Sequence, residues 1–265
     1  MGILNSDITP FAFENVFFAF LQKFLFFIRL CASFCLGGES CVRCGNRSFV
    51  FPLCRMCRRD FAESDFSRRC GVCGKELVSE LEICSACRKS PVIKDVEKVF
   101  PLHSYRFWKK SLLFDWKLGG KRSMSVYFAG MVAKKLKEIE SENGSFFIVP
   151  VPPRPGKIRE KGWDQVEELC FYLKYGWNFQ VAPVLTRLSS VQQKKLGRAE
   201  RLSSGGNSYA LTEKKKLRRF MKKNQGREVI IDDVITTGST IQNCAELLIS
   251  AGFKSVYALS IFIVD

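Results

Sequence analysis

Two adjacent carboxylates, Asp232 and Asp233, stand in the stretch EVIIDDVITTGST, two residues before a run of small hydroxyl residues interrupted by one glycine. That run consists of Thr236, Thr237, Gly238, Ser239 and Thr240. Its backbone N–H groups and hydroxyls suit a phosphate, above all where a helix begins. The carboxylates would repel a phosphate, but they accept hydrogen bonds from vicinal hydroxyls or support a metal ion. The two halves together predict a site for a sugar phosphate.

The elements that position these residues follow from the apolar pattern on either side. Residues 229–231 read as a buried strand that ends at Asp232 and Asp233, and a helical pattern runs over 239–251 before Gly252. Short apolar runs alternate with helix-like runs through 91–265, which is typical of an α/β domain with a parallel sheet. Ligands of such sheets bind beyond the carboxyl ends of the strands, where the acidic pair is expected.

Eight cysteines in four CxxC pairs give a metal-binding pattern. They are Cys41, Cys44, Cys54, Cys57, Cys70, Cys73, Cys84 and Cys87. Two such pairs complete a tetrahedral Cys₄ site, so the pattern predicts two zinc ions. Nine residues separate the first two pairs and ten separate the last two, which favours pairing of neighbours into two ribbons, with cross-bracing as the alternative. All positions being thiolate, the zinc ions should be structural rather than catalytic.

Composition divides the chain into an apolar amphipathic segment at 1–36, a cysteine-rich module at 37–90 and an α/β domain at 91–265. Asn15, Gln22 and Arg29 form one polar stripe on the first segment, which favours docking of residues 11–36 on a membrane or protein surface over spanning. Cys31 and Cys35 of this segment are expected to be small buried hydrophobes.

Charge and cysteine usage bear on location and partners. The 265 residues carry a formal net charge of +16, which suggests an anionic partner. With no cleavable signal sequence and most cysteines in CxxC pairs, a reducing cytoplasm is expected, with the inner face of the membrane as an alternative place. His103, the single histidine, has no marked nucleophile beside it and is expected to be structural.

A basic segment over 213–227, EKKKLRRFMKKNQGR, precedes the strand of the acidic pair. It carries eight basic residues and one acidic residue, among them Lys214, Lys215, Lys216, Arg218 and Arg219. The segment is either a solvated face or a track for the phosphate backbone of single-stranded DNA, with Phe220 as a stacking group.

The stretch with the acidic pair resembles the phosphoribosyl-pyrophosphate (PRPP) motif of type I phosphoribosyltransferases. The chain from Cys41 onward also resembles the ComF family, in which a double zinc ribbon precedes such a domain. Its matching positions are Tyr105, Lys117, Arg159, Lys161, Gly162, Trp163, Gln165, Gln193, Leu196 and Arg201. The family has Phe-Asn where this chain has Trp163 and Asp164, and the change puts a carboxylate near the expected pyrophosphate.

The resemblance implies a role for each part of the site. Asp232 and Asp233 would contact the ribose hydroxyls, the loop 236–240 would hold the 5′-phosphate, and Arg159 and Lys161 would help to bind PRPP, together with Mg²⁺. It implies transfer of phosphoribose with release of pyrophosphate, a glycosyltransferase reaction, and a link to DNA uptake in competence. Because no later segment remains to build a hood over an acceptor base, a non-catalytic module that senses PRPP and binds single-stranded DNA is the alternative.

Overall fold

The structure is a computed structural model that describes residues 37–49, 51–63, 68–188, 208–212 and 227–265. It also describes six helical residues near the start of the chain, Phe24, Phe27, Ile28, Cys31, Ala32 and Cys35.

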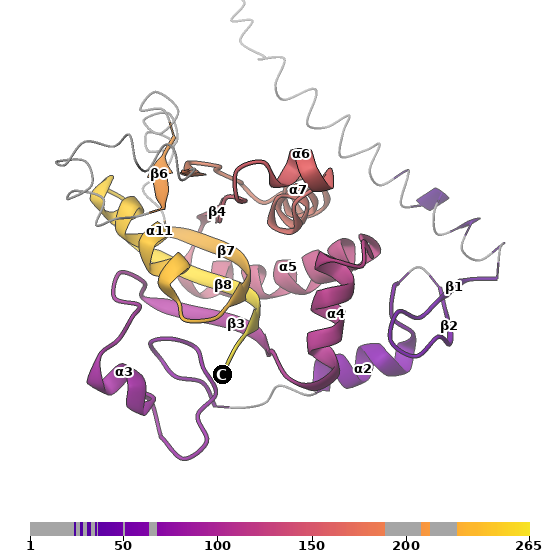
Figure 1. Cartoon of the computed structure of the whole chain (residues 1–265), viewed down its shortest axis with the longest axis horizontal. Coiled ribbons are helices and arrows are strands. Elements are labelled where there is room, and N and C mark those ends of the chain that lie inside the picture. The colour runs from indigo at the N-terminus through magenta and orange to yellow at the C-terminus, as the bar shows by residue number, and fades with distance from the viewer. Residues whose placement is uncertain are drawn as a thin grey trace, which may run out of the picture.

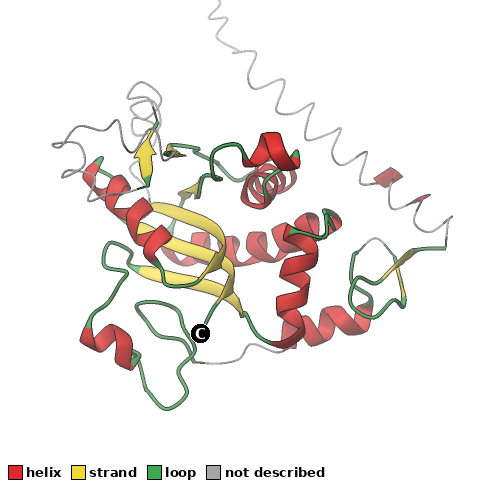
Figure 2. Cartoon of the chain, viewed as in Figure 1, coloured by secondary structure: helices red, strands yellow, loops and turns green. Residues whose placement is uncertain are grey.

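A four-stranded parallel sheet forms the centre of the chain (Figure 2). Its strands, in spatial order, are β3 (Lys98–Ser104), β8 (Val256–Ile263), β7 (Arg227–Ile235) and β4 (Phe146–Pro150). Val181 adds an isolated parallel bridge to Ile148, on the outer side of β4. All eight residues of β8 are buried, as expected for a strand covered on both faces. The predicted α/β class with a parallel sheet is confirmed.

Helices cover both faces of this sheet (Figure 1). Between β3 and β4 lie α4 (Phe107–Lys117) and α5 (Ser123–Asn143), and after β4 come α6 (Lys157–Lys161) and α7 (Gln165–Trp177). The apolar residues of α4, α5 and α7 share one core with Val229 and Ile231 of β7. On the other face α11 (Ser239–Ser250), the crossover from β7 to β8, packs against Ile230 and Ala258.

Two small modules precede the sheet, and each packs against a different core. The first contains β1 (Glu39–Ser40), β2 (Arg47–Ser48) and α2 (Arg55–Glu63), and its Phe61 packs with the core of α5 and α7. The second contains α3 (Ser85–Lys89), and its Cys73 packs against the core of α11. A short antiparallel hairpin, β5 (Leu185–Arg187) with β6 (Tyr209–Leu211), lies outside the central sheet.

Two predictions about local structure are wrong. The strand β7 does not end at the acidic pair, because Asp232, Val234 and Ile235 still pair with β8, so Asp232 and Asp233 lie within its C-terminal half. Cys31 and Cys35 are exposed rather than buried. The helix face that carries these two thiols also carries Phe24, Phe27 and Ile28, which are 51%, 60% and 46% exposed.

His103 is buried in the core, with the ring of Phe61 at 4.0 Å between centroids and Nζ of Lys109 at 3.1 Å from its Nδ1. A position inside the packed core agrees with a structural residue. Among the described residues, no helix combines the length and the apolar character needed to cross a membrane. Most of the predicted N-terminal helix, including Asn15, Gln22 and Arg29, lies outside the described residues.

Candidate functional site

The eight CxxC cysteines gather into two groups of four, each of which could hold a metal ion. Cys41, Cys44, Cys54 and Cys57 form the first group, and Cys70, Cys73, Cys84 and Cys87 form the second. In each group the four sulfurs lie within 4.8 Å of one another. Neighbouring pairs therefore combine in sequence order, and the cross-braced alternative does not occur.

The spacing of the sulfurs suits zinc. Cys44 Sγ and Cys54 Sγ are 3.7 Å apart, and Cys73 Sγ and Cys84 Sγ are 3.8 Å apart. Four sulfurs about 2.3 Å from a tetrahedral zinc ion would be separated by about 3.8 Å. Because all four ligands of each group are thiolates, the ions would stabilise the two modules rather than activate water.

The backbone of each ribbon favours thiolates at its first cysteine. Burial raises the pKa of the Cys41 thiol, but backbone N–H groups of Cys54, Cys44 and Arg43 outweigh it and lower the pKa to about 7. The same opposition holds at Cys70, where N–H groups of Cys84, Cys73 and Val72 lower the pKa to about 7. Because zinc binds the deprotonated sulfur, these hydrogen bonds prepare the ligands.

The hydroxyl loop leads from β7 into α11, as the strand, loop and helix pattern predicts. Gly238 is the N-cap of this twelve-residue helix and has φ of 88°, a left-handed conformation that suits glycine. Thr236, Thr237 and Ser239 are exposed, and the hydroxyls of Thr237 and Ser239 lie 2.6 Å apart. The loop thus presents hydroxyls at the positive end of the helix dipole.

The acidic pair lies beside a lysine from a distant part of the chain. Asp233 is buried and its Oδ2 is 2.8 Å from Nζ of Lys117, at the end of α4. Asp232 is half-buried and its Oδ1 accepts a hydrogen bond of 2.8 Å from the N–H of Asp233. Burial, and secondly the charge of Asp233, raise the pKa of Asp232 to about 7. A cation or a hydroxyl donor would therefore find a carboxylate poised to ionise near neutral pH.

A pocket of about 260 Å³ connects the acidic pair with four basic side chains. Its lining includes Asp232, Asp233, Thr240, Lys117, Arg154 and Lys157. The hairpin adds Arg187 and Tyr209, with Arg187 Cζ 5.4 Å from the centre of the Tyr209 ring. Sequence reasoning did not single out Arg154, Lys157, Arg187 or Tyr209 as site residues. The turn sequence PPRPGK, beside the predicted Arg159, was the available signal for the first two.

Asp164, the departure from the family pattern, also lines this pocket, but its charge is compensated. Its Oδ1 accepts hydrogen bonds from the N–H groups of Val166 and Glu167, which makes it the N-cap of α7. Its Oδ2 is 2.5 Å from Nζ of Lys157. Lys157 also bonds the side chain of Gln165, whose Nε2 reaches the carbonyl of Lys117.

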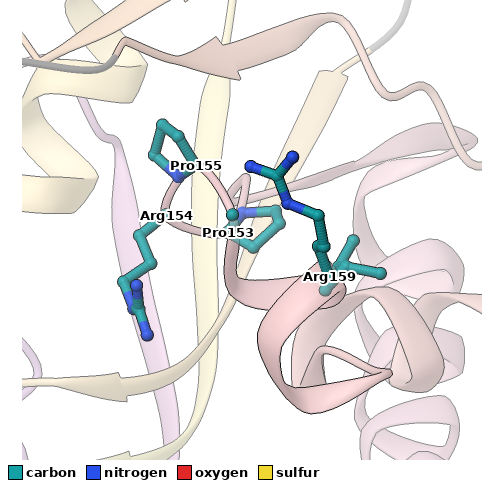
Figure 3. A pocket seen from close by; sticks show the side chains of 6 residues that line it. Pro153, Arg154, Pro155 and Arg159 are labelled. Carbon is teal, nitrogen blue, oxygen red and sulfur yellow. The ribbon is translucent and has the colours of Figure 1, made fainter.

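The two predicted basic residues of α6 lie away from this pocket. Arg159 lines a more open hollow of about 520 Å³ with Pro153, Arg154, Pro155 and Ile158. Figure 3 shows the side chains of Arg154 and Arg159 pointing away from each other. Arg154 pairs with Glu160 at 2.5 Å, and Lys161 is exposed at the end of α6.

The basic candidates Lys214, Lys215, Lys216, Arg218 and Arg219 lie outside the described residues. So do Gln193, Leu196 and Arg201.

Comparison with known proteins finds similarity to a competence protein. No family model matches the chain. Over 213 residues the chain is 25% identical to competence protein ComFC of Streptococcus pneumoniae, a match that covers 79% of this chain and 86% of that protein. The parallel sheet with its N-terminal cysteine modules has the architecture of a type I phosphoribosyltransferase-like domain behind a double zinc ribbon. This similarity and the two four-cysteine groups support the resemblance of the chain to the ComF family.

Proposed function

We propose that the chain binds PRPP, with Mg²⁺, in the pocket between the acidic pair and the start of α11. The observation that carries this proposal is the meeting of Asp232 and Asp233 with Thr240, in the first turn of α11, and with several cationic side chains at one pocket. Carboxylates suit the vicinal hydroxyls of ribose, and the helix N-terminus suits its 5′-phosphate.

Cationic side chains around the pocket match the second anionic group of PRPP. Lys117, Lys157, Arg154 and Arg187 line the pocket, and Arg159, on α6, lines the neighbouring hollow. A pyrophosphate group would replace the carboxylates that now pair with Lys117 and Lys157, or share these ammonium groups with them. Mg²⁺ would neutralise phosphate charge, and Asp232 and Asp233 would be the carboxylates that support it.

Transfer of phosphoribose would use the same groups. As pyrophosphate leaves, positive charge develops on the ribose ring, so a transferase needs positioning and electrostatic stabilisation rather than a covalent nucleophile. Asp232, with its pKa near 7, would stabilise that charge once ionised. Lys117 and Lys157 would stabilise the departing pyrophosphate. The similarity to a competence protein supports a role linked to competence.

Calorimetric titration of PRPP with Mg²⁺ into the purified chain tests the proposal. Replacing both Asp232 and Asp233 with Asn should weaken binding at least about tenfold, since hydrogen bonds to charged groups contribute roughly 1.5–3 kcal/mol each. Glu246→Gln, at an exposed position of α11, is the control and should bind as wild type. Wild-type protein without affinity for PRPP or ribose 5-phosphate would contradict the proposal. If PRPP binds, an assay for pyrophosphate release with bases, amines or DNA distinguishes an enzyme, which releases pyrophosphate, from a sensor, which does not.

Binding of single-stranded DNA is a second candidate, favoured by the surface of the first cysteine module. Arg47, Arg55 and Arg59 are exposed there, close in sequence to exposed Phe49 and Met56. Arginines beside apolar and aromatic side chains suit a nucleic-acid strand, in which phosphates alternate with stacking bases. Such a module would act without turnover of PRPP.

A further inference from the structure

The segment between the second cysteine module and β3 is bonded to the first turns of α11. Gln242, on α11, accepts hydrogen bonds at its Oε1 from the N–H groups of Lys94 at 2.7 Å and Asp95 at 3.2 Å. Its Nε2 donates to Oδ2 of Asp95 at 2.5 Å. One glutamine thus makes three hydrogen bonds to a segment about 150 residues earlier in the chain.

Ile93 of the same segment packs under the hydroxyl loop itself. It is 2% exposed, and a Cβ added to Gly238 would lie 2.8 Å from its Cδ1 and Cγ1. Gly238 is also the residue with the left-handed backbone that turns the loop into α11. The segment 93–95 therefore contacts the turn at two places, through the packing of Ile93 under Gly238 and through the hydrogen bonds of Gln242.

This segment continues into the second cysteine module. The module packs closely against β3, since a Cβ on Gly74 would lie 2.8 Å from Cδ of Pro101 and 3.2 Å from Cγ1 of Val99. Beyond Asp95, the N–H of Glu97 bonds the carbonyl of Val256 at 2.9 Å. The first module packs through Phe61 into the core on the opposite face of the sheet. The two modules therefore differ in how they connect to the hydroxyl loop.

We propose that Ile93 and Gln242 are positioning residues that hold the loop 236–240 ready for an anion, and that the second cysteine module supports them through its linker. The proposal rests on the proposed function, because it assigns this loop to a phosphate. Backbone N–H groups bind a phosphate tightly only when they already point at it, so restraint of the loop raises affinity without any contact to the ligand. The second module thereby takes part in ligand binding from outside the pocket.

Hydrogen exchange of the amides in 236–240, followed by mass spectrometry without ligand, tests the positioning directly. Gln242→Leu keeps the size of the side chain and removes its three hydrogen bonds, and Ile93→Ala removes the packing under Gly238. Each should raise exchange of these amides about tenfold relative to wild type, while the amides of α5 stay as reference. Glu246→Ala, one turn further along α11, is the matched control and should leave exchange unchanged. Unchanged exchange in both variants would overturn the proposal.

Titration with ribose 5-phosphate separates this proposal from the proposed function. Affinity in Gln242→Leu should fall about tenfold, in step with the exchange. If wild type itself does not bind, the proposed function fails, and the exchange result alone decides the positioning role.

The route through the second module has its own comparison. Cys84→Ser with Cys87→Ser should raise exchange in 236–240, whereas Cys44→Ser with Cys57→Ser should not. Equal exchange in the two double variants would exclude the second module as the support.

Discussion

Asp164 lines the pocket that we propose for PRPP, yet its negative charge is compensated. Its two oxygens are both engaged, one by the N–H groups at the start of α7 and the other by Lys157. The helix N-terminus and the ammonium together compensate the negative charge. As a result, the ammonium of Lys157 bonds Asp164 and Gln165 and is less available to a ligand.

Replacement of Asp164 should separate its capping role from its charge. Asparagine keeps the oxygen that caps α7 but not the charge that holds Lys157, so Asp164→Asn should bind PRPP more tightly than wild type. Asp164→Ala loses the cap as well, so its free energy of unfolding should be about 1 kcal/mol lower than that of the asparagine variant. Urea unfolding and calorimetry measure the two effects. Weaker PRPP binding by Asp164→Asn would mean that the carboxylate itself contributes to the site.

Glu228, at the start of β7, should make the stability of the chain depend on pH. The residue is 1% exposed, and its Oε2 has no hydrogen-bond partner among the described residues. Burial raises its pKa to about 8. Above the ordinary carboxyl pKa, the folded protein then binds more protons than the unfolded chain. The free energy of unfolding therefore falls as pH rises from the ordinary carboxyl pKa through about 8.

Glu228→Gln should remove this dependence, because a neutral amide does not ionise. The free energy of unfolding of the variant, relative to wild type, should rise by about 1–2 kcal/mol from pH 6 to pH 8.5. Urea unfolding at several pH values measures it, with Glu246→Gln, at an exposed position, as the control that should show no trend. A constant difference across the pH series would show that Glu228 stays ionised or finds a partner.

At the scale of elements, the sequence predicted what depends on local pattern. The apolar run 229–231, the hydroxyl loop and the start of α11 at Ser239 were predicted correctly, and so was the pairing of neighbouring CxxC motifs. The continuation of β7 through the acidic pair was missed, because polar side chains end the apolar pattern while backbone pairing with β8 goes on to Ile235.

Contacts between distant segments were also beyond the sequence. Lys117 meets Asp233 across 116 positions, and nothing in either local pattern indicates this ion pair. Arg187 and Tyr209 reach the pocket because the hairpin β5–β6 folds beside it. Such residues are brought together by the topology of the sheet rather than by periodicity.

Zinc removal should affect the two modules more than the sheet. Elemental analysis should give two zinc ions per chain, and Cys57→Ser or Cys87→Ser should each reduce the content to about one. The second module buries only a small cluster around Cys70, Leu77 and Cys84, too little apolar area to stay folded without metal. After chelation, proteolysis should therefore cut within 68–90 while the sheet domain resists. Two zinc ions retained by either single-cysteine variant would show that the assignment of ligands is wrong.

At the scale of the whole molecule, positive charge and the proposed site lie close together in the sequence. The chain carries +16, and eight of its basic residues lie in the segment 213–227, which leads into β7. A PRPP pocket needs only a few cations, so a charge this large is more than a single small ligand requires. A long polyanion such as single-stranded DNA would use the remainder.

Reversal of Lys214, Lys215, Lys216, Arg218 and Arg219 to Glu should therefore weaken binding of single-stranded oligonucleotides. Each phosphate that pairs with a basic side chain releases counterions, so the slope of log affinity against log salt should flatten by about 0.7 for every phosphate that is no longer neutralised. Fluorescence anisotropy across a salt series measures both quantities. The control reverses five exposed lysines elsewhere, Lys89, Lys110, Lys134, Lys137 and Lys254, which changes the net charge equally.

The comparison of the two charge-reversed proteins decides between a binding track and a general field. If the basic segment binds phosphates directly, its reversal flattens the salt slope. The control reversal should lower affinity only by weakening long-range attraction, with little change in slope. Equal slopes in the two proteins would show that 213–227 is a solvated face. Loss of DNA binding with retained PRPP affinity would show that the nucleotide pocket and the basic segment act independently.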